Sequence, residues 1–498
     1  MSKKIGGAVA LVGMCAVSLF LLNCGNSSNR PSGVLYVLTQ GINGSGNSVS
    51  LFTIDLYSGN LSLLESSPST CPTPPSGSNS APCGLPLDIV VEPPGATAFV
   101  LDQGVATATP PVAPAIYSYT VNTGGILSAP GATPTWNCIS PAGTPCSATN
   151  SYPDTAVAMV RDAAGQFLFV IDQGTYPSPT TCPSIATPAT NATQAADFVG
   201  CPSISVYALT QGSTSLTLVS QSSTYQSPFF LSKIPTALST ITFTPSSGTP
   251  EELLFVTNNY DLCTIGCLNG PPPPPRDNTV SVYSVSSSGI LTEQLNSPYV
   301  VAAADPISVQ AVNTNPPGES TGGVFVYVGS QNNNAGQLYP FQLCTVQNTA
   351  CSPEAVQDNL MLPLAQQPCN TPPCTVPPTS AGSYPGQMVL DPTNNFLYVA
   401  SSLSNQIFGF RINTTAGKLT PLSPAYQPAG TNPVSMVLLP SVSNTGQSLT
   451  DNNYGQFLYV SNNGSSNITG FTLSTTSGSM SSPITALAPA APSGIAVY

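Results

Sequence analysis

The sequence contains no histidine, and only 6% of its 498 residues are charged. The absence of histidine excludes Ser-His-Asp and Cys-His catalysis, as well as zinc sites with histidine ligands. The charge that is present is one-sided, with 8 basic and 20 acidic residues and a formal net charge of −12. Because such a surface repels phosphate backbones, we expect no nucleic-acid partner.

Proline and glycine are abundant, at 53 and 41 residues. Serine, threonine and asparagine fill the stretches between short apolar runs. Pro, Gly and Asn mark turns for distinct backbone reasons, so this composition is typical of many short strands joined by turns. We therefore expect an all-β protein.

The N-terminus has the pattern of an export signal, with Lys3 and Lys4 followed by an apolar run from Ile5 to Leu22. The end of this run resembles the lipobox of bacterial lipoproteins, in which a cysteine becomes the lipidated first residue. That resemblance implies a signal peptide at residues 1–23, lipidation of Cys24, a linker at 24–33 and anchoring in the cell envelope, with the outer membrane permitted. An uncleaved anchor is the alternative, since 18 apolar residues just reach spanning length. Loss of the leader removes two lysines and changes the net charge from −12 to −14.

The cysteine count also favours export. Of 14 cysteines, one leaves with the leader and one is Cys24, so 12 remain as six neighbouring couples. Short spacing and an oxidising compartment predict local disulfides. A metal site at Cys263 and Cys267 lacks a second pair of ligands, so we expect no metal site there. The predicted couples are Cys71 with Cys83, Cys138 with Cys146, Cys182 with Cys201, Cys263 with Cys267, Cys344 with Cys351, and Cys369 with Cys374.

Three signatures recur seven times along the chain. The first is a proline-led apolar strand, at 86–91, 153–160, 235–243, 306–312, 385–390, 433–439 and 492–498. The second is an aromatic-Val pair, beginning at Tyr36, Phe99, Phe169, Phe255, Tyr327, Tyr398 and Tyr459. The third is a strand of the form apolar-x-x-aromatic-x-apolar, such as Val280/Tyr283/Val285, and a fourth strand follows a Gly turn. Four short alternating strands in each of seven units predict a β-propeller.

The two ends of the chain complete each other. The last proline-led segment, residues 492–498, has no aromatic-Val strand after it, and the first aromatic-Val strand, residues 34–38, has no proline-led strand before it. We expect these two segments to pair and close the ring. Residues 34–498 then form a single seven-bladed propeller with four-stranded antiparallel blades.

The motifs FLYVSNNGSSNITGFTL and FLYVASSLSNQIFGFRINTTAGKLTPL, with NPVSMVLL, resemble the lactonase-type propellers. That family includes 6-phosphogluconolactonase-like enzymes and YVTN-repeat surface proteins, and the resemblance spans residues 34–498. It implies hydrolysis of a sugar lactone, with an acid, an arginine and a histidine in a central pocket. The histidine has no counterpart here. We expect Arg161 at the turn between the first and second strands of its blade, on the face of the ring opposite to the one that carries most of the cysteine couples. Arg411 is expected on a blade surface and Arg276 in a loop.

A polar pair ends each second strand, and the pairs share one face of the ring. A circle of amides and carboxylates could bind a sugar or Ca²⁺, both of which favour oxygen-rich sites. The alternative is that these side chains satisfy backbone groups at turns. The candidate ligand-binding residues are Asp102, Gln103, Asp172, Gln173, Asn258, Asn259, Asn462 and Asn463.

Three hypotheses for function follow. The first is a monomeric, lipid-anchored binding or scaffold module that recognises a glycan, a peptide or an envelope protein through the face that carries most of the cysteine couples. The second is a lactonase, which the family resemblance implies. The third is a structural surface-layer component, for which a low charge and protease-resistant loops would suffice.

Overall fold

The computed structural model describes residues 32–40, 47–69, 84–92, 97–103, 114–128, 135–136, 156–174, 201–219, 229–231, 233–243, 250–261, 276–301, 305–314, 323–332, 335–344, 360–364, 376–439, 456–481, 483–488 and 490–498. These residues form strands and turns, and no helix occurs among them. The leader, Cys24 and the linker up to residue 31 lie outside them. The predicted signal peptide, lipidation and domain boundaries therefore stay predictions.

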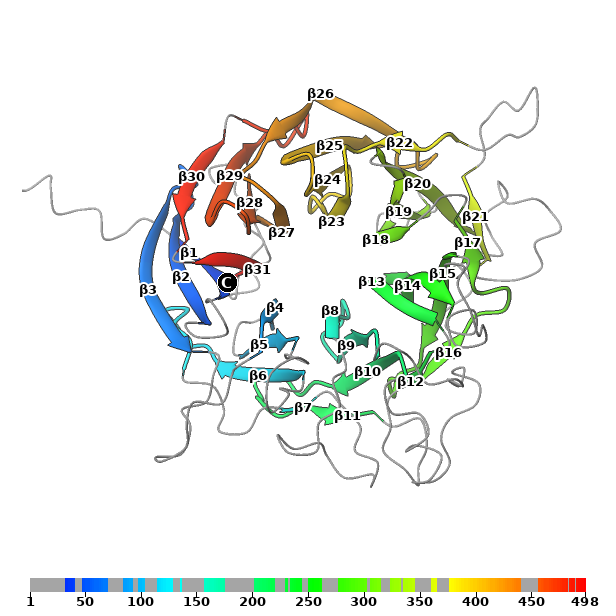
Figure 1. The fold of residues 1–498 in the computed structure, drawn as a ribbon, viewed down its shortest axis with the longest axis horizontal. Coiled ribbons are helices and arrows are strands. Elements are labelled where there is room, and N and C mark those ends of the chain that lie inside the picture. The colour runs from blue at the N-terminus through cyan, green and yellow to red at the C-terminus, as the bar shows by residue number, and fades with distance from the viewer. Residues whose placement is uncertain are drawn as a thin grey trace, which may run out of the picture.

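The strands form seven antiparallel sheets arranged as a ring around an open centre (Figure 1). Blade 1 comprises β31 (Ala491–Val497), β1 (Ser32–Gln40), β2 (Ser48–Asp55) and β3 (Leu61–Ser69). Blade 2 comprises β4 (Pro86–Val91), β5 (Thr97–Asp102), β6 (Ala115–Thr120) and β7 (Thr135–Trp136). Blade 3 comprises β8 (Ala156–Arg161), β9 (Phe167–Asp172), β10 (Ser203–Ala208), β11 (Thr217–Leu218) and β12 (Phe229–Phe230).

Blade 4 comprises β13 (Lys233–Phe243), β14 (Glu251–Asp261), β15 (Arg276–Val285), β16 (Leu291–Glu293) and β17 (Tyr299–Val300). Blade 5 comprises β18 (Pro306–Asn313), β19 (Val324–Asn332), β20 (Ala335–Cys344), β21 (Leu360–Pro363) and β22 (Thr379–Ser380). Blade 6 comprises β23 (Pro385–Leu390), β24 (Phe396–Ser401), β25 (Gln406–Ile412) and β26 (Leu419–Pro428). Blade 7 comprises β27 (Pro433–Leu439), β28 (Gln456–Asn462), β29 (Asn467–Leu473) and β30 (Ile484–Leu487).

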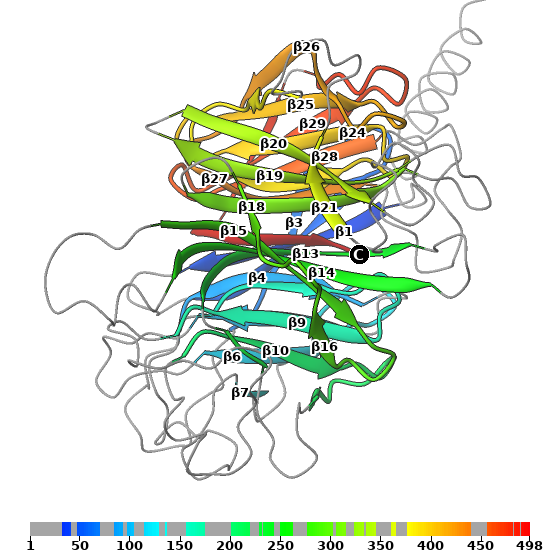
Figure 2. The same cartoon turned by 90° about the vertical axis from the view of Figure 1, so that its right-hand side faces the viewer.

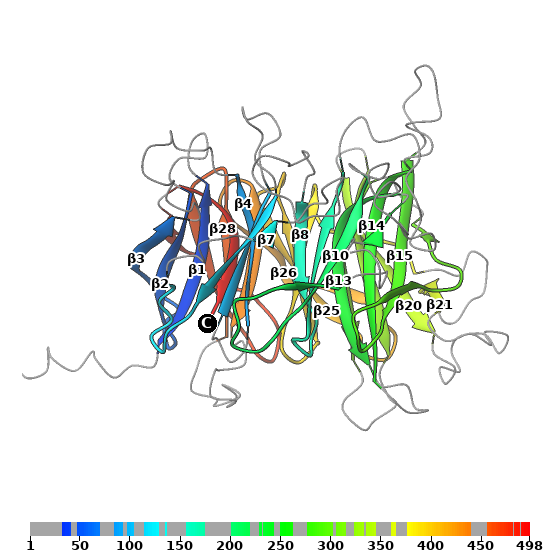
Figure 3. The ribbon, with the colours of Figure 1, turned by 90° about the horizontal axis from the view of Figure 1, so that it is seen from below.

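The predicted all-β, seven-bladed architecture is thus confirmed. The proline-led segments are the innermost strands (β31, β4, β8, β13, β18, β23 and β27), and the aromatic-Val segments are the second strands (Figure 1). Within each blade the strands run alternately up and down, roughly along the axis of the ring, as the two side views show (Figures 2 and 3). Proline suits the first position of an inner strand because that position needs no ladder donor.

The ring closes as expected from the two ends of the chain. Strand β31 pairs antiparallel with β1, in the register Leu35↔Val497, Tyr36↔Ala496 and Val37↔Ile495. Beyond the strand, Tyr498 and Val34 exchange backbone hydrogen bonds of 2.8 and 3.2 Å. Strand β1 extends past the predicted 34–38 at both ends, to Ser32–Gln40, while β31 begins and ends one residue before the predicted 492–498, at Ala491–Val497.

The outermost strand is interrupted in three blades, which the sequence did not predict. In blades 3, 4 and 5 two short strands pair with the same third strand: β11 and β12 with β10, β16 and β17 with β15, and β21 and β22 with β20. In blade 4 the break contains Asn296, whose φ of 74° cannot continue a strand. The weak Gly-turn signature located β16 of blade 4, after Gly289, but none of the second pieces.

The core is divided among the joints between blades. Each of the seven clusters of buried apolar side chains draws on two neighbouring blades; the cluster between blades 6 and 7, for example, joins Phe396 and Tyr398 to Leu458 and Phe471. A single blade therefore cannot bury its own faces, which is the energetic reason that the ring folds as one body.

Tyrosines of the second strands add a hydrogen bond to four of these joints. Each hydroxyl donates to the carbonyl of a positive-φ glycine in the turn before the outer strand of the next blade. The bonds are Tyr36 to Gly125 (2.6 Å), Tyr327 to Gly417 (2.8 Å), Tyr398 to Gly478 (2.7 Å) and Tyr459 to Gly59 (2.8 Å). All four tyrosines are buried, so these bonds satisfy groups that water cannot reach.

Candidate binding channel

A cavity of about 540 Å³ occupies the centre of the ring and is lined by residues of all seven inner strands. Alternate residues of a strand point to opposite faces, so each inner strand contributes only a few side chains to it. The polar residues of the lining are Gln40, Asp88, Ser239, Thr240, Ser308, Gln310, Gln387, Asn432, Ser435, Asn463 and Ser493. The apolar residues of the lining include Val157, Leu238 and Val434. Such a mixture of apolar surface and neutral hydrogen-bonding groups is typical of small-molecule sites.

Asp88 is the one charged residue among the described residues that line this cavity. Its Oδ1 accepts a hydrogen bond from the Ile89 N–H (2.8 Å), and its Oδ2 accepts one from the Met159 N–H of the next blade (3.3 Å). Burial raises the pKa of Asp88 to about 6, although these two backbone hydrogen bonds act in the opposite direction. The carboxyl group can therefore gain or lose a proton near neutral pH.

Blade 6 has a neutral counterpart of Asp88. Gln387 is also the second residue after the proline of its inner strand, and its Oε1 accepts a hydrogen bond from the Met436 N–H of the following blade. A neutral amide thus fulfils the structural role of linking two inner strands. The charge of Asp88 is not needed for that role.

We expect Asp88→Asn to stabilise the protein above pH 6. A carboxyl group whose pKa is raised on folding, here from 3.8 to about 6, contributes stability below the lower value and loses it as the pH rises through the higher one. Allowing for water in the channel, we expect a gain of about 1–2 kcal/mol at pH 7.5 and a flatter stability curve between pH 4 and 6. Urea unfolding across pH 4–8 measures it. Gln387→Glu is the control and should introduce a smaller loss of stability on raising the pH, because Gln387 is exposed and a carboxylate there keeps its water. An unchanged Asp88→Asn curve would contradict the assignment.

The predicted ring of polar pairs separates into two groups. The second residue of several pairs reaches the next blade, where its amide donates to the carbonyl of the proline at or near the start of the inner strand. These bonds are Gln40 to Pro86 (3.0 Å), Gln173 to Pro235 (3.0 Å) and Asn463 to Pro492 (3.2 Å). These amides satisfy backbone groups, as in the alternative considered from the sequence, but they do so between blades rather than within a turn. Of the eight predicted residues, Asn463 is the one that lines the cavity.

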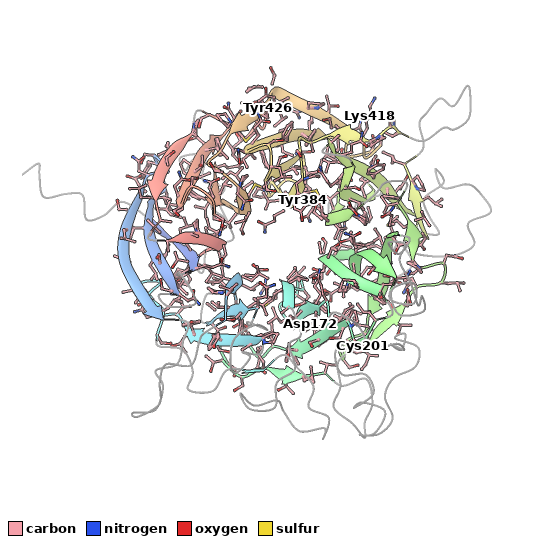
Figure 4. All side chains as sticks on the ribbon, in the orientation of Figure 1. Asp172, Cys201, Tyr384, Lys418 and Tyr426 are labelled. Carbon is pink, nitrogen blue, oxygen red and sulfur yellow. The ribbon has the colours of Figure 1, made fainter. Side chains whose placement is uncertain are left out.

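The first residues of the pairs lie deeper in the blades. Asn258 donates to Ser281 Oγ (2.9 Å), and Asn462 donates to Thr469 Oγ1 (2.9 Å), so both amides bind within their own blades. Asp102 and Asp172 are also buried, and Figure 4 shows Asp172 within blade 3. None of these four is among the residues that line the cavity. Gln103 donates its backbone N–H to the Leu85 carbonyl (2.9 Å), while Asn259 is half-buried at the end of its pair.

Sequence reasoning missed Asp88 because it reads as an ordinary polar residue in an apolar strand. The signal was its place two residues after Pro86 in a proline-led segment, since these segments form the wall of the channel.

Arg411 lies on a blade surface, as the sequence predicted. Its guanidinium lies 4.7 Å from the centre of the Phe396 ring and donates to the Thr476 carbonyl (3.0 Å).

The predicted disulfides fall almost wholly outside the described residues. Cys201 is buried and disulfide-bonded, and the backbone of Cys344 ends strand β20. The six predicted pairings therefore stay predictions. The other ten cysteines of these couples lie outside the described residues: Cys71, Cys83, Cys138, Cys146, Cys182, Cys263, Cys267, Cys351, Cys369 and Cys374.

Neither a metal site nor a membrane-spanning helix is found in the part of the chain that the structure describes. Where the side chains are described, no group of three or more Cys, Asp or Glu residues is placed to hold a metal ion. No helix among the described residues is long and apolar enough to cross a membrane.

Comparison with known proteins gives the class of the fold. No protein-family model matches the sequence, and no curated protein sequence matches it. Solved structures do match over nearly the whole chain. The periplasmic gluconolactonase of Pseudomonas aeruginosa is 15% identical, with a TM-score of 0.53 over 94% of this chain and 99% of that one.

Two candidate 6-phosphogluconolactonases give similar values. The one from Bacteroides fragilis is 12% identical, with a TM-score of 0.52 over 95% of this chain and 99% of that one. The one from Bacteroides uniformis is 13% identical, with a TM-score of 0.53 over 94% and 99%. The fold is therefore the seven-bladed propeller of 6-phosphogluconolactonase-like structures, as the sequence motifs predicted. At these identities the likeness establishes the fold alone.

Proposed function

We propose that this protein binds an uncharged, hydroxyl-rich small molecule of the sugar or sugar-lactone class in its central channel. The observation that carries the proposal is the lining of the channel, where residues with hydroxyl and amide side chains from successive blades, among them the half-buried or exposed Thr240, Gln310, Gln387 and Asn432, border one cavity of about 540 Å³. Neutral donors and acceptors at fixed positions recognise hydroxyl groups, and the apolar residues between them suit the C–H groups of a sugar ring.

The charge of the lining favours a neutral ligand over a phosphorylated one. A phosphate group would meet the Asp88 carboxylate and, among the described lining residues, no lysine or arginine. Phosphate recognition in proteins generally relies on such cations. We therefore expect an unphosphorylated sugar or lactone.

Thermal-shift and calorimetric titrations with methyl β-glucoside, glucono-1,5-lactone and 6-phosphogluconate test this proposal. The two neutral compounds should stabilise the protein, and 6-phosphogluconate should not. Ala158→Phe, which enlarges a residue of the channel wall, should abolish the effect, whereas Leu487→Phe on the outer strand β30 should keep it. A phosphorylated ligand binding best, or binding that Ala158→Phe leaves intact, would refute the proposal.

Lactone hydrolysis is the second candidate, and the raised pKa of Asp88 favours it. The Asp88 carboxylate would accept a proton from a water molecule as that water attacks the lactone carbonyl, and the departing ring oxygen would take up the proton when the C–O bond breaks. The rate should rise with pH through about 6, where Asp88 ionises. After subtraction of the spontaneous rate, Asp88→Asn should lower kcat/KM for glucono-1,5-lactone by about 10²–10⁴-fold. Leu487→Phe, on the outer strand β30, should have little effect.

The place of action is proposed to be the cell envelope. A resemblance to a lipobox at Cys24 and the periplasmic origin of one similar structure support export. Recognition of a glycan, peptide or envelope protein through the loop face remains a separate hypothesis, because those loops lie largely outside the described residues. Deletion of residues 182–201 with loss of pull-down partners would test it.

A further inference from the structure

The residue just before the proline of an inner strand has an unusual backbone conformation in three successive blades. It is Asp305 in blade 5, Tyr384 in blade 6 and Asn432 in blade 7, with φ values of 52°, 61° and 55°. In each blade, the carbonyl of this residue accepts a hydrogen bond from the backbone N–H of a residue at the end of the second strand. The donors are Gln331 (3.0 Å), Ser402 (3.1 Å) and Asn463 (2.9 Å), respectively. The left-handed conformation is thus shared by these three blades, whereas Leu85 of blade 2 accepts the corresponding bond from the Gln103 N–H (2.9 Å) without a positive φ.

Two of the three blades fill this position with a residue that tolerates it. Aspartate and asparagine enter the left-handed region several-fold more readily than other non-glycine residues, whereas a tyrosine there is strained. Blade 6 therefore keeps an aromatic residue where its neighbours in the ring have a better-suited one. Strain retained at one copy of a repeated position indicates a role other than stability.

Packing does not account for the tyrosine. The side chain of Tyr384 is 44% exposed, and Figure 4 shows it at the inner edge of the ring, next to the central opening. Two residues that follow it closely, Gly386 and Gln387, line the channel. The tyrosine therefore lies at the mouth of the proposed binding site.

The surrounding hydrogen bonds hold this tyrosine in place from two blades. The Tyr384 N–H donates to Gln331 Oε1 of blade 5 (2.5 Å), while the Ser383 N–H donates to Ser404 Oγ of its own blade (2.7 Å). These bonds fix the backbone at Tyr384, so less backbone freedom is lost when a ligand binds the ring, which favours affinity.

We propose that Tyr384 is a stacking platform for the apolar face of a sugar or lactone ring entering the channel. This inference rests on the proposed function and adds a residue that selects for a cyclic ligand. The C–H groups on one face of a pyranose ring pack against an aromatic ring, while its hydroxyl groups remain available to the polar channel lining. An acyclic polyol has no such face and should gain nothing from Tyr384.

The test compares ligand binding with stability in Tyr384→Asn, which installs the residue that blade 7 has at this position. We expect methyl β-glucoside to bind about tenfold more weakly, as for the loss of one stacking contact. The relieved strain should raise the melting temperature by about 1–2 °C. Tyr384→Phe should bind the glucoside as the wild type does, and sorbitol binding should be the same in all variants. The control Tyr426→Asn, at a 48% exposed tyrosine on the outer strand β26, should not change affinity.

Each outcome decides a different point. If Tyr384→Asn binds the glucoside as tightly as the wild type while Ala158→Phe does not bind it, the channel is the site and the stacking role is wrong. A Tyr384→Asn variant that loses both affinity and thermal stability would show that the ring supports the fold, which also overturns the inference. If the wild type binds none of the neutral probes, the proposed function fails and the inference fails with it.

Discussion

Removing the last eight residues, Ala491 to Tyr498, should abolish the cooperative unfolding of the whole ring rather than delete one strand. Strand β31 pairs with β1 and buries Ile495, Ala496 and Val497. It also contributes to both adjacent joints, since Ser493 Oγ donates to the Pro86 carbonyl (2.6 Å) and Ser461 Oγ to the Ser493 carbonyl (3.2 Å). The lost apolar burial alone is worth about 5 kcal/mol, which is comparable with the whole stability of many proteins.

A milder form of this experiment uses one residue type at two places. Ile495→Asp puts a charge into the buried core between blades 7 and 1 and should lower the free energy of unfolding by about 3–5 kcal/mol. Ile484→Asp, at a position 38% exposed on the outer strand β30, should change it by about 0.5 kcal/mol or less. Circular dichroism melts and urea titrations measure both. A truncated chain that melts as the full-length protein does would contradict closure by β31.

The second large effect is expected at the glycines of the turns before the outer strands. Gly478 has a φ of 72°, and a Cβ atom there would overlap the Phe396 ring of the preceding blade. The carbonyl of the same glycine accepts the Tyr398 hydroxyl (2.7 Å). Gly478→Ala therefore combines a left-handed alanine with a steric clash and disturbs a buried hydrogen bond. We expect a loss of about 3 kcal/mol or more.

Gly386→Ala is the matched control for this prediction. Gly386 has no positive φ, and the nearest atom to an added Cβ is the Ala400 carbonyl oxygen at an ordinary 3.6 Å. Alanine there should be neutral or slightly stabilising, because it restricts the unfolded chain. Equal losses at positions 478 and 386, measured by urea unfolding, would argue against the joint described here.

The fold could be predicted from the sequence because its information is local and repeated. Pro433 to Leu439 and Tyr459-Val460 have the same pattern as six other copies, and period-two alternation has one structural meaning. Closure followed from counting incomplete copies. The split outer strands could not be predicted in this way, because strands of two residues such as β17 carry no periodicity of their own.

The candidate site was harder to predict for a physical reason. The polar pairs recur in every blade, and the structure shows several of them, such as Gln40 and Gln173, linking one blade to the next. What distinguishes the channel lies in single departures from the repeat: a carboxylate at Asp88 where blade 6 has Gln387, and an aromatic ring at Tyr384 where blade 7 has Asn432. A regular pattern reveals the scaffold, whereas function depends on the exceptions.

The joints between blades also bear on how such a protein can diversify. They are made by residues within strands and tight turns, from the proline carbonyls near the axis to the tyrosine–glycine bonds farther out. The chain between successive aromatic-Val pairs can therefore lengthen, here from 61 to 86 residues, without disturbing the geometry of the ring. Insertions can accumulate, or foreign segments be grafted, at these connections independently in each of the seven units. The fold can therefore accept new loop sequences with little loss of stability.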